Sequence, residues 1–465
     1  MRSGGENMKK NILSFSVKTL TLFSVAPLGG LCLVSCNTEP AYKFKEGQPD
    51  YSNKATSNNF RIGAWVAPPP ANWNGGNNET YITQESYDEV AESGVNVIYC
   101  LYEKNNIEEM TNALTYAENA GIEYLATDYN VALDPLEDEL EQGDIKELTS
   151  SYNDKKALRG WLVRDEPSVE EFERLGRCKE FIEKEFPGKE FYINLLPTYA
   201  NSVKMGTFYY EDYIDEYIRV VKPGFLSFDH YAMLQNAFGE KKLTEDVLWN
   251  LDIVANKCKE AEIPMYTFVQ AMRFDEFTRD PNEQEIRHQV LTQLAYGSRS
   301  IQYFCYWTPP SFYMGTPAMI SLDGQKGDIY NYVKQVNSEL KNIDEAFLEF
   351  SWDDTIPVKG SEVIDVVPQY ELLDNPATSF AAIKEYKATQ NTLISRFVDK
   401  EGREAFFVVN FSDPSLEAID NVSITFRGGK KALYYHKLDK KVVDLTKHTI
   451  ELEIEPGDGY FIIPF

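Results

Sequence analysis

Short apolar runs alternate with amphipathic stretches from residue 60 to about residue 350. The apolar runs show little internal alternation, as in Trp161-Leu162-Val163, which is typical of parallel strands covered on both faces. Eight such runs predict strands, at residues 60–66, 95–101, 122–127, 160–163, 191–196, 225–231, 265–270 and 300–307. Stretches with helical periodicity follow them, at residues 86–93, 106–120, 144–155, 169–186, 210–221, 244–262, 282–296 and 327–347.

Eight strand–helix units over about 290 residues match the number of units and the length of a (β/α)8 TIM barrel. An open, doubly wound sheet also alternates strands with helices, but it seldom has eight units. Its usual Gly-rich first turn is also absent from this sequence. We therefore expect an α/β fold with a TIM barrel over residues 60–350.

The pattern changes after residue 350, where helical periodicity stops. Turn signals such as Gly428-Gly429 now separate short apolar runs. These runs predict strands at residues 363–367, 380–386, 393–398, 405–411, 422–426, 431–436 and 460–465. Short strands without helices between them indicate a small all-β sandwich over residues 351–465.

The first 36 residues have the pattern of a secretory signal. Met8-Lys9-Lys10 is basic, and residues 12–34 are mostly apolar. Leu33-Val34-Ser35-Cys36 resembles the lipobox of bacterial lipoproteins, which implies cleavage before Cys36 and lipidation of its thiol. A transmembrane anchor is the alternative, but charged and turn-forming residues interrupt an apolar run that is short for a span. We expect an exported lipoprotein, periplasmic or anchored to the outer membrane with the cell surface left open, and a flexible tether over residues 37–59.

Composition excludes several classes of partner. The 465 residues carry a net charge of −27, a field that repels nucleic acids and other polyanions but leaves neutral ligands unaffected. The cysteines after position 36 are scattered, without metal-ligand spacing, so we expect buried thiols, with disulfides left open. They are Cys100, Cys178, Cys258 and Cys305. No P-loop, GxGxxG or HExxH motif is present, so we expect neither a metal nor a cofactor; the oligomeric state is left open.

The carboxyl ends of barrel strands converge on one face, where catalytic groups lie. Cleaving a glycosidic bond requires one carboxylic acid that protonates the leaving oxygen and a second carboxylate across the sugar ring. We predict that Glu166 is the general acid and that Asp229 or Asp128 is the second group. The other strand-end residues are predicted to bind an oligosaccharide or polysaccharide: Trp65, Arg164, Asp165, Asn194, His230, Tyr231, Gln270 and Trp307.

Several motifs together resemble the clan of retaining glycoside hydrolases that includes the β-galactosidases. Asp165-Glu166-Pro167 lies at the predicted fourth strand end, where the clan usually has Asn-Glu-Pro; His230-Tyr231 follows the sixth strand, and Trp307 the eighth. With Ile193-Asn194-Leu195-Leu196-Pro197 and Gln302-Tyr303-Phe304, residues 60–465 more closely resemble uncharacterised glycoside hydrolases of gut Bacteroidetes. The resemblance implies a barrel, a small β-domain and glycan hydrolysis, but it does not name a sugar.

Gln270 departs from this clan, which has a nucleophilic Glu at the end of the seventh strand. An amide cannot form a glycosyl ester. Either Asp229 or Asp128 replaces the nucleophile, or the reaction inverts through water, or the site binds a glycan without cleaving it. The two functional hypotheses are therefore a glycoside hydrolase and a non-catalytic glycan-binding lipoprotein.

Each candidate also has a purely structural explanation. Asp229 can orient His230, Asp128 can cap a turn, and both tryptophans can fill the barrel core. For Arg164 we expect a pair with Asp165, because a pair with Glu166 would oppose the use of Glu166 as an acid.

Overall fold

The structure is a computed structural model that describes residues 42–52, 60–73, 79–100, 106–128, 131, 142–364 and 366–465. The predicted signal and the lipidation site at Cys36 lie outside these residues. Within them, no helix combines the length and the apolar composition that a membrane span requires.

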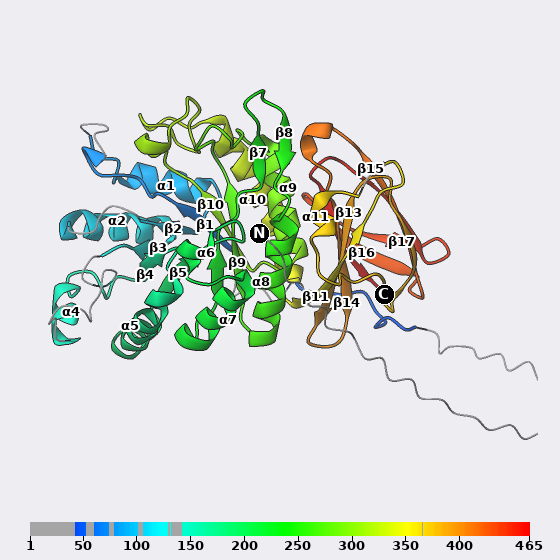
Figure 1. Ribbon diagram of the computed structural model, residues 1–465, viewed down its shortest axis with the longest axis horizontal. Coiled ribbons are helices and arrows are strands. Elements are labelled where there is room, and N and C mark those ends of the chain that lie inside the picture. The colour runs from blue at the N-terminus through cyan, green and yellow to red at the C-terminus, as the bar shows by residue number, and fades with distance from the viewer. Residues whose placement is uncertain are drawn as a thin grey trace, which may run out of the picture. The chain divides into compact units, whose positions relative to one another are not determined.

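Eight parallel strands form a closed barrel, which confirms the predicted fold (Figure 1). The barrel closes where β10 pairs with β1, with Arg61 opposite Ser300. The strands are β1 (Arg61–Trp65), β2 (Val97–Tyr99), β3 (Glu123–Ala126), β4 (Leu158–Asp165), β5 (Glu190–Leu195), β6 (Leu226–Phe228), β9 (Met265–Gln270) and β10 (Ser300–Phe304). Each overlaps one of the eight predicted strands.

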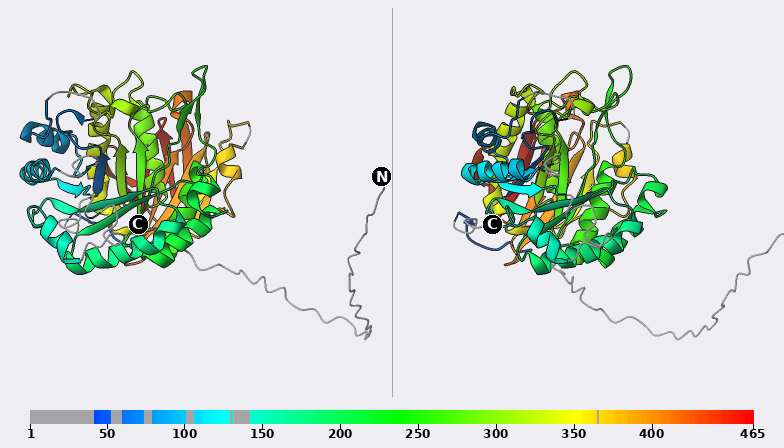
Figure 2. Two further views of the ribbon diagram at one scale, coloured as in Figure 1. Left: turned by 60° about the vertical axis from the view of Figure 1, so that its left-hand side comes forward. Right: turned by 90° about the vertical axis from the view of Figure 1, so that its left-hand side faces the viewer.

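Helices surround the barrel, as the turned views of Figure 2 show. They are α1 (Gln84–Glu92), α2 (Ile107–Ala120), α4 (Gln142–Leu148), α5 (Phe172–Glu185), α7 (Tyr210–Val221), α8 (Val247–Ala261), α9 (Glu283–Ala295) and α10 (Asp328–Phe347). Two additions were not predicted: α6 (Ser202–Met205) after β5, and a hairpin of β7 (Met233–Gln235) and β8 (Lys241–Leu243) after β6. Both follow carboxyl ends of barrel strands, the end where function concentrates in this fold.

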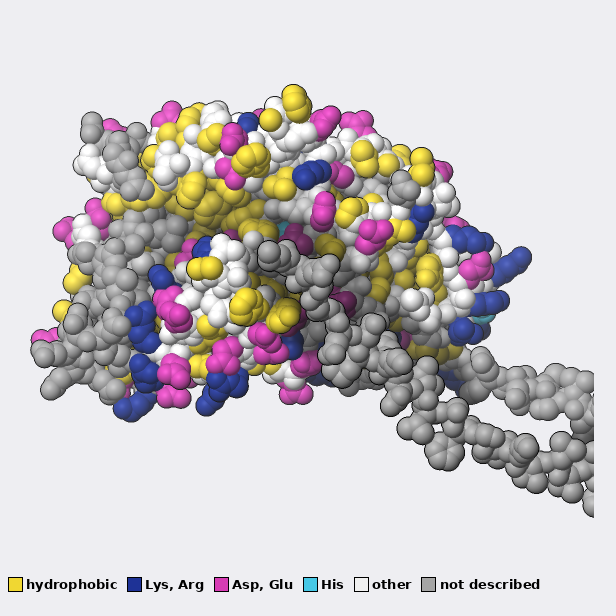
Figure 3. Space-filling view, viewed as in Figure 1, with side chains coloured by type: hydrophobic (Ala, Val, Ile, Leu, Met, Phe, Trp, Pro, Cys, Tyr) yellow, Lys and Arg dark blue, Asp and Glu magenta, His cyan; other side chains and the backbone are white. Residues whose placement is uncertain are grey.

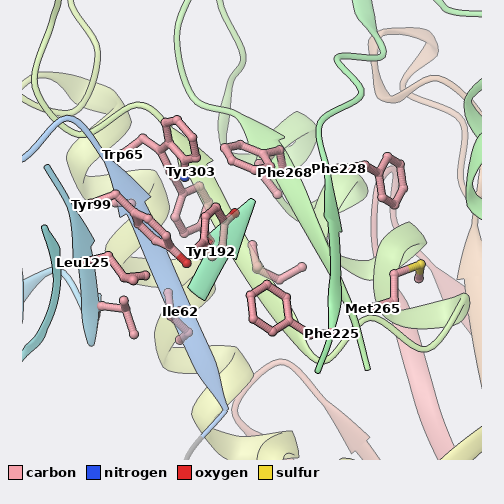
Figure 4. Close-up of a cluster of buried hydrophobic side chains, with 14 of the residues drawn as sticks. Ile62, Trp65, Tyr99, Leu125, Tyr192, Phe225, Phe228, Met265, Phe268 and Tyr303 are labelled. Carbon is pink, nitrogen blue, oxygen red and sulfur yellow. The ribbon is translucent and has the colours of Figure 1, made fainter. Parts of the chain in front are cut away.

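Aromatic rings fill the barrel interior (Figure 4). The Trp65 ring stacks on Tyr99 with centroids 5.5 Å apart, and it meets Phe268 edge-on at 5.1 Å. Tyr192 packs against Tyr99 at 5.0 Å, and its hydroxyl donates to Gln302 Oε1 at 2.6 Å. The barrel interior is therefore a packed core rather than a pore. This core supports the residues at the carboxyl ends of the strands.

The C-terminal domain is a β-sandwich, as predicted. A six-stranded sheet, in the order β11-β13-β14-β19-β16-β17, lies against a three-stranded sheet, in the order β12-β15-β18. Its strands are β11 (Phe350–Val358), β12 (Ile383–Lys387), β13 (Thr392–Asp399), β14 (Glu404–Asn410), β15 (Asp420–Phe426), β16 (Lys431–His436), β17 (Asp439–Asp444), β18 (Thr449–Ile454) and β19 (Gly459–Pro464). The other face of the six-stranded sheet packs on the barrel, where Phe347 of α10 contacts Phe407 and Phe461.

Some predictions for this domain were wrong. The described residues of the predicted strand 363–367 form no strand, and the short helix α11 (Pro368–Glu371) follows it. The strands β11, β17 and β18 were missed. β17 is an edge strand whose side chains are mostly charged and exposed, so it lacks the apolar alternation that predicts a strand.

Residues 42–52 correct the predicted tether, because they pack on the C-terminal domain. Phe44 is buried in the core of the sandwich, with its ring 5.7 Å from that of Phe426. The Tyr51 hydroxyl donates to Asp399 at 3.1 Å, and the Tyr42 hydroxyl to Glu404. This part of the predicted tether is therefore a structural element of the domain.

Candidate active site

The carboxyl ends of β4, β5 and β6 bring Asp165, Asn194 and Asp229 together. In the barrel register Asp165 lies beside Asn194, and Asn194 beside Ser227, two residues before Asp229. The Asn194 amide Nδ2 donates to Asp165 Oδ1 at 3.2 Å and to Asp229 Oδ1 at 2.7 Å. The two bond lengths together limit the separation of these carboxylate oxygens to about 6 Å.

Hydrogen bonds in the barrel interior fix the orientation of the Asn194 amide. Ser227 Oγ donates to Asn194 Oδ1 at 3.1 Å, and Gln302 Nε2 donates to Ser227 Oγ at 3.0 Å. Because the Asn194 amide oxygen accepts a hydrogen bond from the Ser227 hydroxyl, the amide nitrogen points to the two carboxyl groups. The barrel core thus holds the donor that joins the acid pair.

The pKa values of both aspartates are raised. Burial and the nearby Glu166 carboxylate raise the pKa of Asp165 to about 6, although its side chain remains open to solvent. Burial, followed by the charges of Asp165 and Glu166, raises the pKa of Asp229 well above its ordinary value. Carboxyl groups crowded in this way retain a proton at a pH where isolated ones have lost it.

Glu166 is the third carboxylate of this cluster. It follows β4 with φ of +48°, an uncommon region for a residue other than glycine, and its N–H donates to Asn194 O at 2.8 Å. Its carboxylate forms an ion pair with Lys204 of α6. The side chain predicted to protonate the leaving oxygen is therefore already paired with an ammonium group.

Arg164 does not pair with Asp165, contrary to our expectation. Its Nε donates to Glu171 Oε1 at 2.8 Å, and Glu171 Oε2 accepts from the Ser168 N–H at 3.0 Å. Arg164 therefore supports the turn that begins α5, on the outer side of the strand end.

His230 and Tyr231 lie beside the acid pair. His230 Nε2 is 3.1 Å from Asp246 Oδ1, so the partner of the imidazole is Asp246 and not Asp229. The Tyr231 ring packs against Phe304 with centroids 5.8 Å apart. Tyr199 is 53% exposed, and its ring packs edge-on against His230 with centroids 5.0 Å apart.

The other candidate side chains are buried. Asp128 is buried at the end of β3, where it accepts from the Tyr152 hydroxyl. Gln270 is fully buried, and its Nε2 donates to Arg279 O at 2.8 Å. Trp65 and Trp307 are each 3% exposed, so neither ring presents a free face to solvent.

Exposed aromatic residues on the same side of the barrel were missed in the sequence. They lie in the loops after β5, β6, β9 and β10: Tyr199, Phe238, Phe277, Phe312 and Tyr313. Phe312 contacts Phe304 with ring centroids 5.9 Å apart, which links this rim to Tyr231. Figure 3 shows the surface hollowed between α6 and the loops above it, with hydrophobic side chains around the hollow. An aromatic residue in a loop rich in Gly, Asn and Asp, such as Asn236-Ala237-Phe238-Gly239, is the signal that could have found them.

The described residues contain no cluster of His, Cys, Asp and Glu side chains that could hold a metal ion. Within the same part of the chain, four cysteines are buried, as expected: Cys100, Cys178, Cys258 and Cys305. The polar groups that the structure places at this site are carboxyl, amide, ammonium and imidazole groups.

Comparison with known proteins finds neither a matching family model nor a curated protein with a matching sequence. Solved structures do match. A GH42 β-galactosidase from G. stearothermophilus superposes with a TM-score of 0.56 and 9% identity, over 88% of this chain and 98% of that chain. A glucosidase from Croceicoccus marinus gives a TM-score of 0.44 at 11% identity, over 88% of this chain and 96% of the other. A β-galactosidase from Marinomonas ef1 gives 0.41 at 10% identity over 62% of this chain, which spans 60% of that enzyme. The first of these likenesses supports the fold, a parallel eight-stranded barrel followed by a β-sandwich.

Proposed function

We propose that this protein is a glycoside hydrolase that acts on a neutral glycan, with Asp165 and Asp229 as its reacting carboxyl pair. One observation carries the proposal: Asn194 joins two carboxyl groups from different strands, at the barrel end where catalytic groups lie in this fold. The GH42 β-galactosidase among the structural neighbours, and the exposed aromatic residues in the loops after β5, β6, β9 and β10, support a sugar as the ligand.

The raised pKa values of the pair support this reaction. The pKa of Asp165 is raised to about 6 and that of Asp229 is raised well above its ordinary value, which favours a pair that holds one proton between its two carboxyl groups. One group can then protonate the leaving oxygen while the other, ionised, faces the sugar carbon. A limit of about 6 Å between their oxygens favours the retaining geometry, in which the carboxyl groups lie about 5–5.5 Å apart.

Glu166 belongs to the proposed machinery as the charge that raises the pKa of both aspartates. The prediction that Glu166 is itself the acid requires its ion pair with Lys204 to open when substrate enters. We also propose that the chain is an exported lipoprotein lipidated at Cys36, which the lipobox supports.

A second function, glycan binding without cleavage, is favoured by Gln270. This amide stands where the resembling clan has its nucleophile, and it is buried away from the cleft. Under this function the carboxyl cluster would bind sugar hydroxyl groups and would not react.

The test is a screen of aryl glycosides and oligosaccharides against the wild type and three variants: Asp165→Asn, Asp229→Asn and Glu166→Gln. We expect each aspartate variant to lose at least about 10²-fold in kcat, the contribution typical of a positioned acid or base. Glu170→Gln, an exposed carboxylate outside the cleft, should keep full activity. Wild-type turnover that survives both aspartate substitutions would remove the proposed pair, and sugar binding without any turnover would establish the second function.

A further inference from the structure

The β7–β8 hairpin carries the most exposed aromatic side chain of the part of the chain that the structure describes. Phe238 at its tip is 91% exposed, and the hairpin begins at Met233, four residues after Asp229. Burying a Phe side chain is worth about 1.5–3 kcal/mol, so a fully exposed ring contributes little to folding. The Phe238 ring is therefore available to a ligand or partner.

Hydrogen bonds that do not involve the Phe238 side chain organise the tip of the hairpin. Asn236 Oδ1 accepts from the N–H groups of Phe238 at 2.9 Å and Glu240 at 3.0 Å, and Asn236 Nδ2 donates to the Glu240 carboxylate. Gly239, with φ of +79°, completes the turn. Since these bonds organise the turn, the aromatic ring is presented outward by a rigid frame.

A second exposed ring stands on the loop joined to this hairpin. The Gln235 N–H donates to Phe277 O at 2.7 Å, and Leu234 pairs with Thr278. Phe277 is 56% exposed, and its N–H donates to Asp275 Oδ1 at 2.9 Å, an arrangement like that at Asn236. The two loops thus form one unit that presents two phenylalanine rings.

A buried ionic network fixes this unit to the rest of the protein. Arg279, 1% exposed, donates through both terminal nitrogens to the Asp413 carboxylate of the C-terminal domain, at 3.2 and 3.0 Å. Its Nη2 also lies 2.8 Å from Met233 Sδ, at the base of the hairpin. Lys241 of β8 donates to Glu285 at 3.1 Å, and Glu285 also pairs with Arg279. The aromatic unit is therefore held from both domains, and such preorganisation favours binding.

We propose that Phe238 and Phe277 form a stacking surface for the distal sugars of a glycan chain that leads out of the cleft, so that the substrate is a polysaccharide or long oligosaccharide rather than a terminal sugar. The inference rests on the proposed function. The base of the hairpin lies near the candidate site, because β7 begins four residues after Asp229. On this unit exposed Glu240 and Glu276 are balanced by exposed Lys241 and Lys242, but the net charge of −27 of the whole chain opposes binding to an anionic membrane.

The test compares Phe238→Ala, Phe277→Ala and the double variant with Phe208→Ala, an 89% exposed ring on the connection between α6 and α7. Binding is measured as retardation of the protein in native affinity gels that contain galactomannan, xyloglucan, mixed-linkage β-glucan or pectic galactan. Activity is measured on an aryl glycoside and on the polysaccharide that retards the wild type. We expect the double variant to lose retardation and its kcat/KM on the polysaccharide to fall about tenfold further than on the aryl glycoside. Phe208→Ala should match the wild type in both assays.

Three results would overturn the inference and leave the proposed function standing: aryl glycosides are cleaved but no polysaccharide retards the wild type; the double variant binds as the wild type does; or it loses activity equally on both substrates, which would show that the hairpin only holds the site. If the wild type floats with phosphatidylglycerol vesicles and Phe238→Ala does not, while both migrate alike in the affinity gels, the ligand of this surface is a membrane and not a glycan. If the wild type neither cleaves a glycoside nor binds a glycan, the proposed function itself fails.

Discussion

Replacing Asn194 with Ala tests the electrostatics of the acid pair most directly. The amide donates to both carboxylates, and each of these bonds lowers the pKa of the group that accepts it. A hydrogen bond to a charged group is worth about 1.5–3 kcal/mol, and 1.36 kcal/mol corresponds to one pH unit. Because the Asp165 side chain is open to solvent, we take the low end of this range. We therefore expect Asn194→Ala to raise the pKa of Asp165 by about one unit from its value near 6.

The direction of the pKa change depends on which form of the carboxyl groups the Asn194 amide stabilises. Asn194 stabilises the ionised carboxylates, so without it the proton is held to higher pH. The group that must be protonated then stays active to higher pH, and the alkaline limb of the pH–rate profile on an aryl glycoside moves up by about one unit. Carboxyl ¹³C NMR of labelled aspartate measures the same change without turnover.

Ser227→Ala is the matched control for this substitution. It removes the hydroxyl that donates to Asn194 Oδ1 but leaves the amide nitrogen on the carboxylates, so we expect a shift of less than half a unit. An alkaline limb and an NMR titration that both stay in place after Asn194→Ala would refute the coupling of the two aspartates through this amide.

Three further predictions concern stability. Because the pKa of Asp165 is raised from 3.8 to about 6, ionisation of this carboxyl favours the unfolded chain as the pH rises between these two values. Urea unfolding should therefore show that Asp165→Asn stabilises the protein by about 1 kcal/mol at pH 7.5, after allowance for solvent exposure, and has no such effect at pH 3.5. Asp413→Ala should cost about 3 kcal/mol in the same assay, because it removes a carboxylate from the buried Arg279, whereas Asp444→Ala, at a side chain 86% exposed, should change stability by less than about 0.5 kcal/mol. Phe44→Ala should cost about 3 kcal/mol and exposed Lys43→Ala almost nothing; equal values would show that residues 42–52 do not belong to the folded domain.

The order of elements was accessible from the sequence because it depends on local periodicity. Eight apolar runs with helical stretches between them specify parallel strands that need cover on both faces, and closure into a barrel satisfies every strand edge. Strands without that pattern were missed, such as the charged edge strand β17, and so were residues 42–52, whose buried rings stand in a polar segment.

The candidate site was also predicted only in part from the sequence. The strand ends could be read from the chain, so Asp165, Glu166, Asn194 and Asp229 were all named in advance. Their relations could not be read from it, because register between neighbouring strands decides which groups meet: Asn194 joins Asp165 to Asp229, Lys204 reaches Glu166, and Arg164 turns to Glu171.

By itself, then, the sequence determined the barrel, the sandwich and the strand ends that carry polar groups, since hydrophobic period and turn residues act over a few positions. The tertiary structure alone decided which carboxyl groups lie together, which aromatic rings are buried and which are exposed in the loops. Those properties arise from contacts between residues tens to hundreds of positions apart, and burial and neighbouring charge, which set a pKa, exist only once such contacts have formed.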